Sequence, residues 1–336
     1  MEALGIVPFD DACVDDAAVL LAARHQRDRE HEPALPERFI EPSAARAAVL
    51  AAWGEPDASG VVALRDGQLA GFLIGAPEIA EIWGRSVWVR YGGHALADGE
   101  DAELYRDLYA AAAPRWLARG CFAHYAELPA DDTPSLDAWF RLGFGLQAAY
   151  GICPLPADIP VSPRRNSDLA IRRAGPDDRD ALAELAGILW LHMGRSPSYS
   201  VRLPEDADRR QRVAAEVLAD PQRTVWLAER DGAALGMVEI TSLTPGEDLL
   251  DAPERCCFLN VAATREEARG RGIISTLTAH ALRAAHAEGY VASLTDWRVT
   301  NLQASRVWPR LGFRPFQYRL HRLIDDRITW APSFPN

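Results

Sequence analysis

The hydrophobic pattern along the chain passes twice through the same order of periods. Each half opens with a short alternating stretch typical of a strand, followed by an Ala- and Leu-rich stretch with helical spacing behind a pair of aspartates. Two apolar runs separated by Arg-Asp-Gly come next, and an Asp-Gly pair between apolar runs predicts a β-hairpin. We therefore expect strand, helix and hairpin to open each half, with the first strands at residues 5–8 and 170–173.

The remainder of each half also repeats one order of elements. A strand leads into a long helix, and a glycine separates that helix from another strand. A short helix then runs into the hexapeptide Trp-x-Arg-Leu-Gly-Phe, and a last strand ends the half. Strands on both sides of helices predict a mixed α/β fold, in which helices flank a central mixed, mostly antiparallel sheet. These strands are expected at 86–91, 121–127 and 146–153 and at 256–262, 290–295 and 316–323, and the long helices at 101–119 and 272–288.

Short identical sequences at a nearly constant spacing indicate a tandem repeat. Residues 65–71 (RDGQLAG) correspond to residues 230–236 (RDGAALG), and residues 139–144 (WFRLGF) correspond to residues 308–313 (WPRLGF). Because the matches keep their order, we expect two domains of one fold, each closed by its own last strand. The predicted boundaries are 1–153 for the first domain, 154–167 for a Pro-rich linker and 168–336 for the second domain.

Composition and charge narrow the classes of function. The chain of 336 residues has the length of about two domains. Its net charge is −12 and it contains no lysine, which disfavours nucleic-acid binding because neutralising phosphates supplies most of that affinity. The five cysteines form no Cys-x-x-Cys pair, which argues against a disulfide framework and a metal site. No apolar run reaches the ~18 residues of a membrane span and no leader-like segment is visible, so we expect a cytoplasmic protein.

One stretch of the second half carries the strongest candidate chemistry. The strand expected at 256–262 ends in a polar loop, and the sequence Arg269-Gly270-Arg271-Gly272 then opens the long helix. A helix N-terminus offers unpaired N–H groups and a positive partial charge, glycines permit close approach of the backbone, and the two arginines add formal charge. This combination predicts a pyrophosphate-binding site.

Two motifs in the second half resemble signatures of the GNAT superfamily of N-acetyltransferases. Residues 269–274 are similar to its Arg/Gln-x-x-Gly-x-Gly/Ala sequence, whose backbone amides hold the pyrophosphate of coenzyme A. Residues 301–313 are similar to its Asn-x-x-Ala-x-x-x-Tyr-x-x-x-Gly-Phe sequence. The resemblance spans residues 168–325 and implies acetyl-CoA as cofactor. Carried over by position, it implies a cofactor site composed of Asn260, Val261, Ala262, Ala263, Arg269, Gly270, Arg271, Gly272, Ile273, Ile274, Asn301 and Ser305.

Two positions depart from these signatures. Ile274 stands where Gly or Ala is usual and could crowd the cofactor. Trp308 replaces the tyrosine that protonates the leaving thiolate, and an indole N–H does not usefully lose its proton near neutral pH. Trp308 is then either a packing residue or a residue at the thioester end of the pocket. Tyr318, Tyr290 or solvent could supply the proton instead.

Acetyl transfer to an amine also requires a base that removes a proton from the nucleophile. Glu239 is the candidate, because it is a carboxylate within an otherwise apolar strand, where burial would raise its pKa toward a useful range. The alternative is that Glu239 is a structural carboxylate with its hydrogen bonds satisfied. Glu254 and Asp296 are rivals at strand edges, and His192 either lies at the substrate mouth or is a packed residue. Four aromatic residues either line an acceptor pocket or belong to the core: Trp190, Tyr199, Trp226 and Trp297.

The first half lacks the cofactor signals. Residues 98–103 (DGEDAE) correspond to residues 267–272, so four carboxylates occupy the place where a pyrophosphate would bind. Like charges ~4 Å apart repel by about 1 kcal/mol even in water. Asp132 stands at the position of Asn301. We therefore expect a degenerate first domain with a structural role.

These observations predict an acetyl-CoA-dependent N-acetyltransferase that acetylates the amine of a small molecule with its second domain. A GNAT-fold enzyme with another acyl donor or reaction, and a non-catalytic acyl-CoA-binding protein, stay open because of Ile274 and Trp308. The charge of −12 disfavours a transferase that uses aminoacyl-tRNA. The expected partner is a small-molecule amine, without nucleic acid or membrane, and the expected state is a monomer with pseudo-dimeric repeats or a homodimer.

Overall fold

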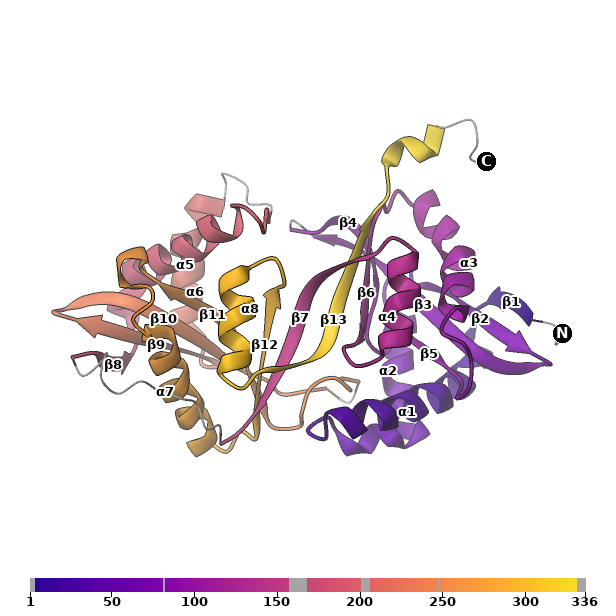
Figure 1. Ribbon diagram of the computed structural model, residues 1–336, viewed down its shortest axis with the longest axis horizontal. Coiled ribbons are helices and arrows are strands. Elements are labelled where there is room, and N and C mark those ends of the chain that lie inside the picture. Colours follow the sequence, from indigo (N-terminus) through magenta and orange to yellow (C-terminus); the bar gives the residue numbers. More distant parts are fainter. Residues whose placement is uncertain (1–3, 81, 157–167, 201–205, 247, 331–336) are drawn as a thin grey trace. The chain divides into compact units, whose positions relative to one another are not determined.

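The computed structural model describes residues 4–80, 82–156, 168–200, 206–246 and 248–330 (Figure 1). Contacts divide the chain into two compact units. The first unit comprises Met1–Ala148, Pro245–Pro253 and Phe316–Asn336, and the second comprises Ala149–Thr244 and Glu254–Pro315. Each unit has the mixed α/β composition that the sequence predicts.

The first unit contains ten elements of the first half of the chain and one from its end. They are β1 (Leu4–Pro8), α1 (Val14–His31), α2 (Pro42–Gly54), β2 (Ser59–Arg65), β3 (Gln68–Ala80), β4 (Gly84–Val89), β5 (His94–Leu96), α3 (Leu104–Ala118), β6 (Ala123–Pro129), α4 (Thr133–Arg141) and β13 (Arg314–Leu323). The strand order is β1-β2-β3-β4-β6-β13, with β5 paired to β3. All pairs are antiparallel except β4 with β6. Apolar side chains of α1 and α2 pack on one face of the sheet, and those of α3 and α4 pack on the other.

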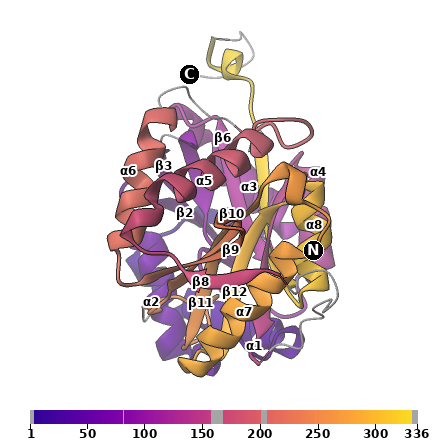
Figure 2. The ribbon, with the colours of Figure 1, turned by 90° about the vertical axis from the view of Figure 1, so that its left-hand side faces the viewer.

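The second unit repeats this plan. Its elements are β7 (Gly145–Pro154), β8 (Ala170–Arg173), α5 (Arg179–Met193), α6 (Asp206–Ala219), β9 (Arg223–Arg230), β10 (Ala233–Ser242), β11 (Cys256–Thr264), α7 (Ile273–Ala287), β12 (Ala292–Arg298) and α8 (Leu302–Arg310). The strand order is β7-β12-β11-β10-β9-β8, and β11 and β12 run parallel. A core cluster joins α5 and α6 to one face of β9–β11, while α7 packs against the same strands from the other side (Figure 2).

The repeated hexapeptide forms the corner at which α4 and α8 end. Gly143 and Gly312 follow the helices with φ of +82° and +94°, a left-handed conformation that glycine adopts without a steric penalty. The next residues, Phe144 and Phe313, are buried in their own units. The hexapeptide therefore recurs because it turns the chain from helix to strand and anchors that strand.

Most predicted elements are present, with ends displaced by a few residues. The two Arg-Asp-Gly sequences connect β2 to β3 and β9 to β10 as expected. The sequence did not predict α2 or α6, because the helical spacing before each hairpin was assigned to a single helix. The short strand β5 was not predicted either. Residues 157–167 of the predicted linker lie outside the described residues.

The last strands depart from the expectation that each closes its own domain. β13 pairs antiparallel with β6 of the first half, in the register Gln317↔Pro129 to Leu323↔Ala123. The first unit therefore includes Phe316 onward, and Pro245–Pro253 also belongs to it, so the compact units differ from the predicted boundaries 1–153 and 168–336. The two last strands have similar apolar patterns, which predict a strand but do not specify its neighbour.

Candidate active site

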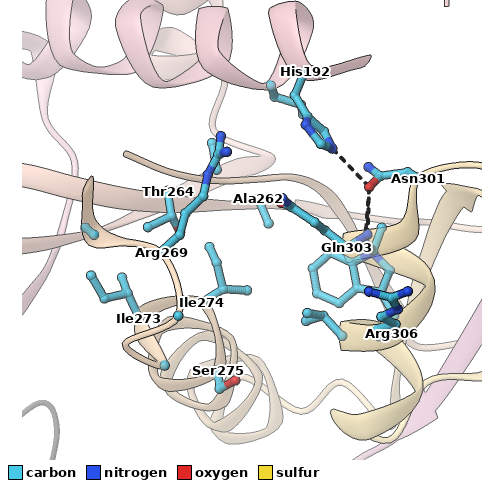
Figure 3. A pocket seen from close by; sticks show the side chains of 18 of the residues that line it. His192, Ala262, Thr264, Arg269, Ile273, Ile274, Ser275, Asn301, Gln303 and Arg306 are labelled. Carbon is cyan, nitrogen blue, oxygen red and sulfur yellow. Dashed lines mark hydrogen bonds between the residues drawn. The ribbon is translucent and has the colours of Figure 1, made fainter. Parts of the chain in front are cut away.

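A cavity of about 460 Å³ lies in the second unit, between α5, the end of β11, the start of α7 and α8 (Figure 3). Two sequence segments that are distant along the chain meet here, the Arg-Gly-Arg-Gly loop and the start of α8. Eight of the twelve predicted cofactor residues line this cavity: Ala262, Ala263, Arg269, Gly270, Gly272, Ile273, Ile274 and Asn301. The structure thus brings together most of the set that the motifs indicated.

The N-terminus of α7 gives the cavity its anion-binding character. Gly272 is the N-cap residue with φ +79°, and no side chain caps the helix. The first-turn N–H groups of Ile273, Ile274 and Ser275 have no helical carbonyl partner, as at any helix start, and all three residues line the cavity. Because the helix dipole adds a positive partial charge, this terminus is suited to a pyrophosphate.

Arginines add formal charge to the same cavity. Arg269 comes from the loop before α7, and Arg306 and Arg310 come from α8. Among the described residues that line the cavity there is no aspartate or glutamate. The motif analysis missed Arg306 and Arg310, although their spacing of four residues places them on one side of a helix. A positive lining within a chain of net charge −12 indicates an anionic ligand.

Ile274 does not fill the cavity. Its side chain forms part of the wall (Figure 3), and the volume of about 460 Å³ is present with this residue in place. The preceding Ile273 is buried and contributes to the core of the unit. The β-branched residues at the end of the motif therefore leave room for a ligand beside the helix N-terminus.

Asn301 caps α8 and faces the cavity. Its Oδ1 accepts hydrogen bonds from the backbone N–H groups of Gln303 and Ala304, both at 3.2 Å, as expected of an N-cap asparagine. The same oxygen lies 3.2 Å from Nε2 of His192, near the end of α5 (Figure 3). His192 is also one of the residues that line the cavity.

Trp308 is a packed residue that also borders the cavity. It lines the cavity and is 7% exposed, and its ring packs edge-on against Phe313 with centroids 5.7 Å apart. The aromatic residues Trp190, Tyr199, Trp226 and Trp297 do not line this cavity. Of these four, Trp297 is buried and Tyr199 is exposed.

Four predicted cofactor residues are not part of the cavity wall. Val261 packs against the α5–α6 core and Arg271 is exposed. The Ser305 hydroxyl donates to the carbonyl of Val299 at 2.9 Å. Asn260 lies on β11 with its amide 3.4 Å from Glu239. Their side chains are thus engaged elsewhere or directed away from the cavity.

The predicted catalytic pair is also absent from the wall. Glu239 lies on β10, 5% exposed, with Oε1 3.2 Å from Nη1 of Arg223. Burial raises the pKa of Glu239 and the Arg223 guanidinium opposes that shift. Tyr318 lies on β13 and packs against the core of the first unit. Of the alternatives, Tyr290 donates to Ser242 at 2.6 Å.

The acidic loop of the first unit is held by arginines of that unit. Glu100 makes a bidentate pair with Arg65, with both contacts at 2.8 Å, which lowers the pKa of Glu100. Glu103 contacts Arg106 at 2.7 Å and Arg141 at 2.8 Å. The carboxylates at the position that corresponds to the Arg-Gly-Arg-Gly loop are therefore paired with arginines of the first unit.

Large side chains also fill the inner part of the first unit where the second unit has its cavity. When the two halves are aligned by the pairing of β5 with β3 and of β11 with β10, His94 corresponds to Ala262. Tyr105 corresponds to Ile274, because each is the second residue of its helix, α3 or α7. Both are buried, and His94 Nδ1 lies 2.8 Å from the Tyr105 hydroxyl. Arg24 of α1 donates to the His94 carbonyl at 2.6 Å. At the positions that correspond to the cavity of the second unit, the first unit thus has large buried side chains and carboxylates paired with arginines.

Comparisons with known proteins agree with these features. Residues 188–313 match the family model described as the acetyltransferase (GNAT) family. A GCN5-related N-acetyltransferase from Sphaerobacter thermophilus has a similar fold, with a TM-score of 0.60 and 16% identity over 95% of each chain. A tandem GNAT protein from the clavulanic acid biosynthesis pathway gives a TM-score of 0.50 and 17% identity, over 96% of this chain and 98% of that one.

A third similar structure is a glucosamine N-acetyltransferase region of a fungal multi-domain β-N-acetylglucosaminidase. Its TM-score is 0.55 at 15% identity, over 96% of this chain and 38% of that chain. No curated protein sequence matches the chain. In the described residues, no helix is both long and apolar enough to cross a membrane. The likenesses show that the chain has the tandem GNAT fold.

Proposed function

We propose, for a chain whose residues 188–313 are a GNAT acetyltransferase domain, that the second unit transfers an acetyl group from acetyl-CoA to the amine of a small molecule. The observation that carries this proposal is the cavity in which the α7 N-terminus and three arginines converge. A thioester of coenzyme A supplies an activated acyl carbon together with a pyrophosphate that such a cavity can hold.

The residues of the cavity have separable tasks in this proposal. The first-turn N–H groups of α7 and the guanidinium of Arg269 bind the pyrophosphate. Arg269 is available for this, because its ion pair with Glu266 is long, at 3.9 Å, and the Glu266 side chain is 80% exposed. Trp308 and Ile274 exclude water from the inner wall, and Asn301 orients His192.

The acceptor is proposed as a neutral or cationic small molecule. A net charge of −12 repels polyanionic acceptors, and the arginines of the cavity are committed to the anionic cofactor. A coenzyme A thioester with an acyl group other than acetyl is compatible with the same cavity. Both a monomeric and a homodimeric state are compatible with the proposed function. The proposal assigns the activity to the second unit, and the buried His94–Tyr105 pair and the paired carboxylates at the corresponding positions of the first unit support this assignment.

A second candidate function is acyl-CoA binding without transfer, because Trp308 occupies the position of a proton-donating tyrosine. Two measurements separate the candidates. Calorimetric titration with acetyl-CoA reports binding, and release of free thiol in the presence of a panel of primary amines reports transfer. Binding together with amine-dependent thiol release supports the enzyme, whereas binding without release supports the second candidate.

Matched charge reversals test whether the cavity is the binding site. Arg269→Glu should weaken acetyl-CoA binding about tenfold or more, because it replaces a charge-assisted hydrogen-bond donor with a repelling carboxylate. Arg283→Glu makes the same change in net charge at an exposed position of α7 outside the cavity wall. Equal losses in both variants would contradict the assignment of the cavity, since only a long-range effect of charge would then remain.

A further inference from the structure

The N-cap of α8 determines how the Asn301 carboxamide is oriented. Two backbone N–H groups, those of Gln303 and Ala304, point at one atom of the amide, each at 3.2 Å. An amide nitrogen cannot accept hydrogen bonds from backbone donors, so this atom is Oδ1. The same atom lies 3.2 Å from Nε2 of His192. Since Oδ1 only accepts, Nε2 of His192 must carry a hydrogen.

This orientation determines the tautomer that His192 adopts when its ring is neutral. With the hydrogen on Nε2, the lone pair of the neutral imidazole is on Nδ1. Among the described residues, Nδ1 has no hydrogen-bond partner. His192 borders the main cavity and also a smaller one of about 230 Å³ that shares Ile188 and Arg269 with it. The lone pair therefore belongs to a ring that lines both cavities.

The surroundings of His192 contain charges of both signs. Arg306 and Arg310 of α8 line the main cavity with it. The smaller cavity is lined by Arg195, after α5, and by Arg265, Glu266, Glu267 and Arg269 of the loop before α7. Two of these cations are paired with carboxylates, Arg265 with Glu184 and Arg269 with Glu266. The side of the ring toward Asn301 is neutral, because Asn301 is an amide.

We propose that His192 carries the proton in the acyl transfer, with Asn301 as its positioning residue. This inference rests on the proposed function. The attacking neutral amine forms the C–N bond and its excess proton passes to Nδ1 of His192. The C–S bond breaks, and the same proton then passes to the thiolate sulfur, so that the ring ends neutral. One group thus serves as base and then acid, which accounts for a site in which Trp308 replaces the expected tyrosine.

Contacts favour His192 over Glu239 for this task. Glu239 is engaged by Arg223 at 3.2 Å and lies outside the cavity wall. His192 lines the wall and is held by one hydrogen bond that leaves its second nitrogen available. A base oriented by a third side chain is the recurrent arrangement of proton-transfer groups in acyl transfer.

The first test reads the tautomer without any catalysis. In the full-length chain labelled with ¹⁵N, two-bond ¹H–¹⁵N correlation spectra of the eight histidines report which ring nitrogen is protonated. The signals of His192 are assigned by their loss in His192→Gln. The neutral tautomer is expected to carry its hydrogen on Nε2. Hydrogen on Nδ1 would remove the proposed acceptor and overturn the inference.

The second test measures transfer and binding in the same variants. Thiol release from acetyl-CoA is followed with the amine that the native chain acetylates fastest, and binding of coenzyme A is followed by calorimetry. His192→Gln should lower kcat about 100-fold or more, a usual size for loss of an acid–base group, while coenzyme A affinity stays within about twofold. Added imidazole should restore part of the rate. The control is His286→Gln, at an exposed position of α7.

The outcomes separate this inference from the proposed function. Normal turnover in His192→Gln, with a large loss in Glu239→Gln, would assign the proton to Glu239 and overturn the inference while leaving the transferase intact. A native chain that binds acetyl-CoA but releases no thiol with any amine would overturn the proposed function, and the proton-transfer role with it. Loss of coenzyme A binding in His192→Gln would make His192 a binding residue instead of a catalytic one.

Discussion

His94 and Tyr105 form a buried hydrogen bond in the first unit, with 2.8 Å between Nδ1 and the phenol oxygen. They occupy the positions at which the second unit has Ala262 and Ile274, two residues of the cavity wall. The second unit therefore has a cavity at positions where the first unit has two large buried side chains. Filling a site with a polar pair stabilises the unit only if each polar atom has a partner.

This hydrogen bond predicts that removal of the Tyr105 hydroxyl destabilises the first unit. Tyr105→Phe should lower the free energy of unfolding of the first unit by about 1–3 kcal/mol, because the buried Nδ1 of His94 loses its shorter hydrogen bond and keeps only the Arg24 guanidinium at 3.4 Å. Acetyl-CoA should still bind with a stoichiometry of one. Urea unfolding and calorimetry measure the two quantities. The matched control is Tyr199→Phe, whose ring is 71% exposed. Binding of a second equivalent of acetyl-CoA by the native chain or by Tyr105→Phe would contradict a first site filled by side chains.

A buried histidine predicts that stability falls in acid. Burial lowers the pKa of His25 from 6.5 to about 4, and its Nε2 lies 2.8 Å from the Pro36 carbonyl. The unfolded chain binds this proton below about pH 6.5 and the folded chain only near pH 4, so unfolding takes up a proton in that window. The free energy of unfolding contributed by His25 is therefore present above pH 6.5 and is lost as the pH falls toward 4.

The measurement must isolate His25, because burial raises the pKa of Asp28 from 3.8 to about 6 and this acts in the opposite direction. We expect urea unfolding between pH 7 and pH 4 to show a shallower loss of stability in His25→Gln than in the native chain. The control variant is His286→Gln, at an exposed position. Identical slopes in the native chain and His25→Gln would show that His25 does not titrate differently on folding.

The conformation of Gly272 at the N-cap of α7 predicts that a substitution there weakens acetyl-CoA binding in addition to lowering stability. Gly272 has φ +79°, where a Cβ costs roughly 1–2 kcal/mol. Gly272→Ala should therefore be destabilised and should also bind acetyl-CoA more weakly, because relief of the strain displaces the first-turn N–H groups. Gly67, with φ +83° and open space around it in the first unit, allows the matched variant Gly67→Ala. Gly67→Ala should lose similar stability and should bind acetyl-CoA as the native chain does. If Gly272→Ala bound acetyl-CoA equally well, Gly272 would not belong to the binding site.

Local patterns were sufficient for one part of the site. The Arg-Gly-Arg-Gly loop needs only the glycine conformations and the helix that follows, and Asn301 needs only its own cap, so both could be predicted from neighbouring residues. The contact of His192 with Asn301 joins positions 109 residues apart, on two helices. No periodicity encodes such a contact, since it depends on how α5 and α8 pack on the sheet.

The arrangement of the strands was equally beyond local pattern. The alternation in residues 316–323 predicts a strand, and the structure confirms it as part of β13. Its pairing with β6, however, is decided by the competition between two similar strands for two sheet edges. The acidic loop predicted that the first half lacks the cofactor signals. The large side chain of His94 at the position of Ala262 becomes visible only when the strand registers are aligned.

The position of β13 makes the stability of the first unit depend on the end of the chain. Leu320 is 0% exposed and belongs to the core cluster formed by α3, α4 and the neighbouring strands. Leu320→Ala should destabilise the first unit by about 2–5 kcal/mol, the usual cost of such a truncation in a core. Hydrogen exchange of residues 123–129, the β6 partner of β13, should accelerate accordingly. Leu323→Ala, on the same strand with 73% exposure, should leave both quantities nearly unchanged. If exchange accelerates in β12 of the second unit and β6 stays protected, then β13 closes its own half in solution.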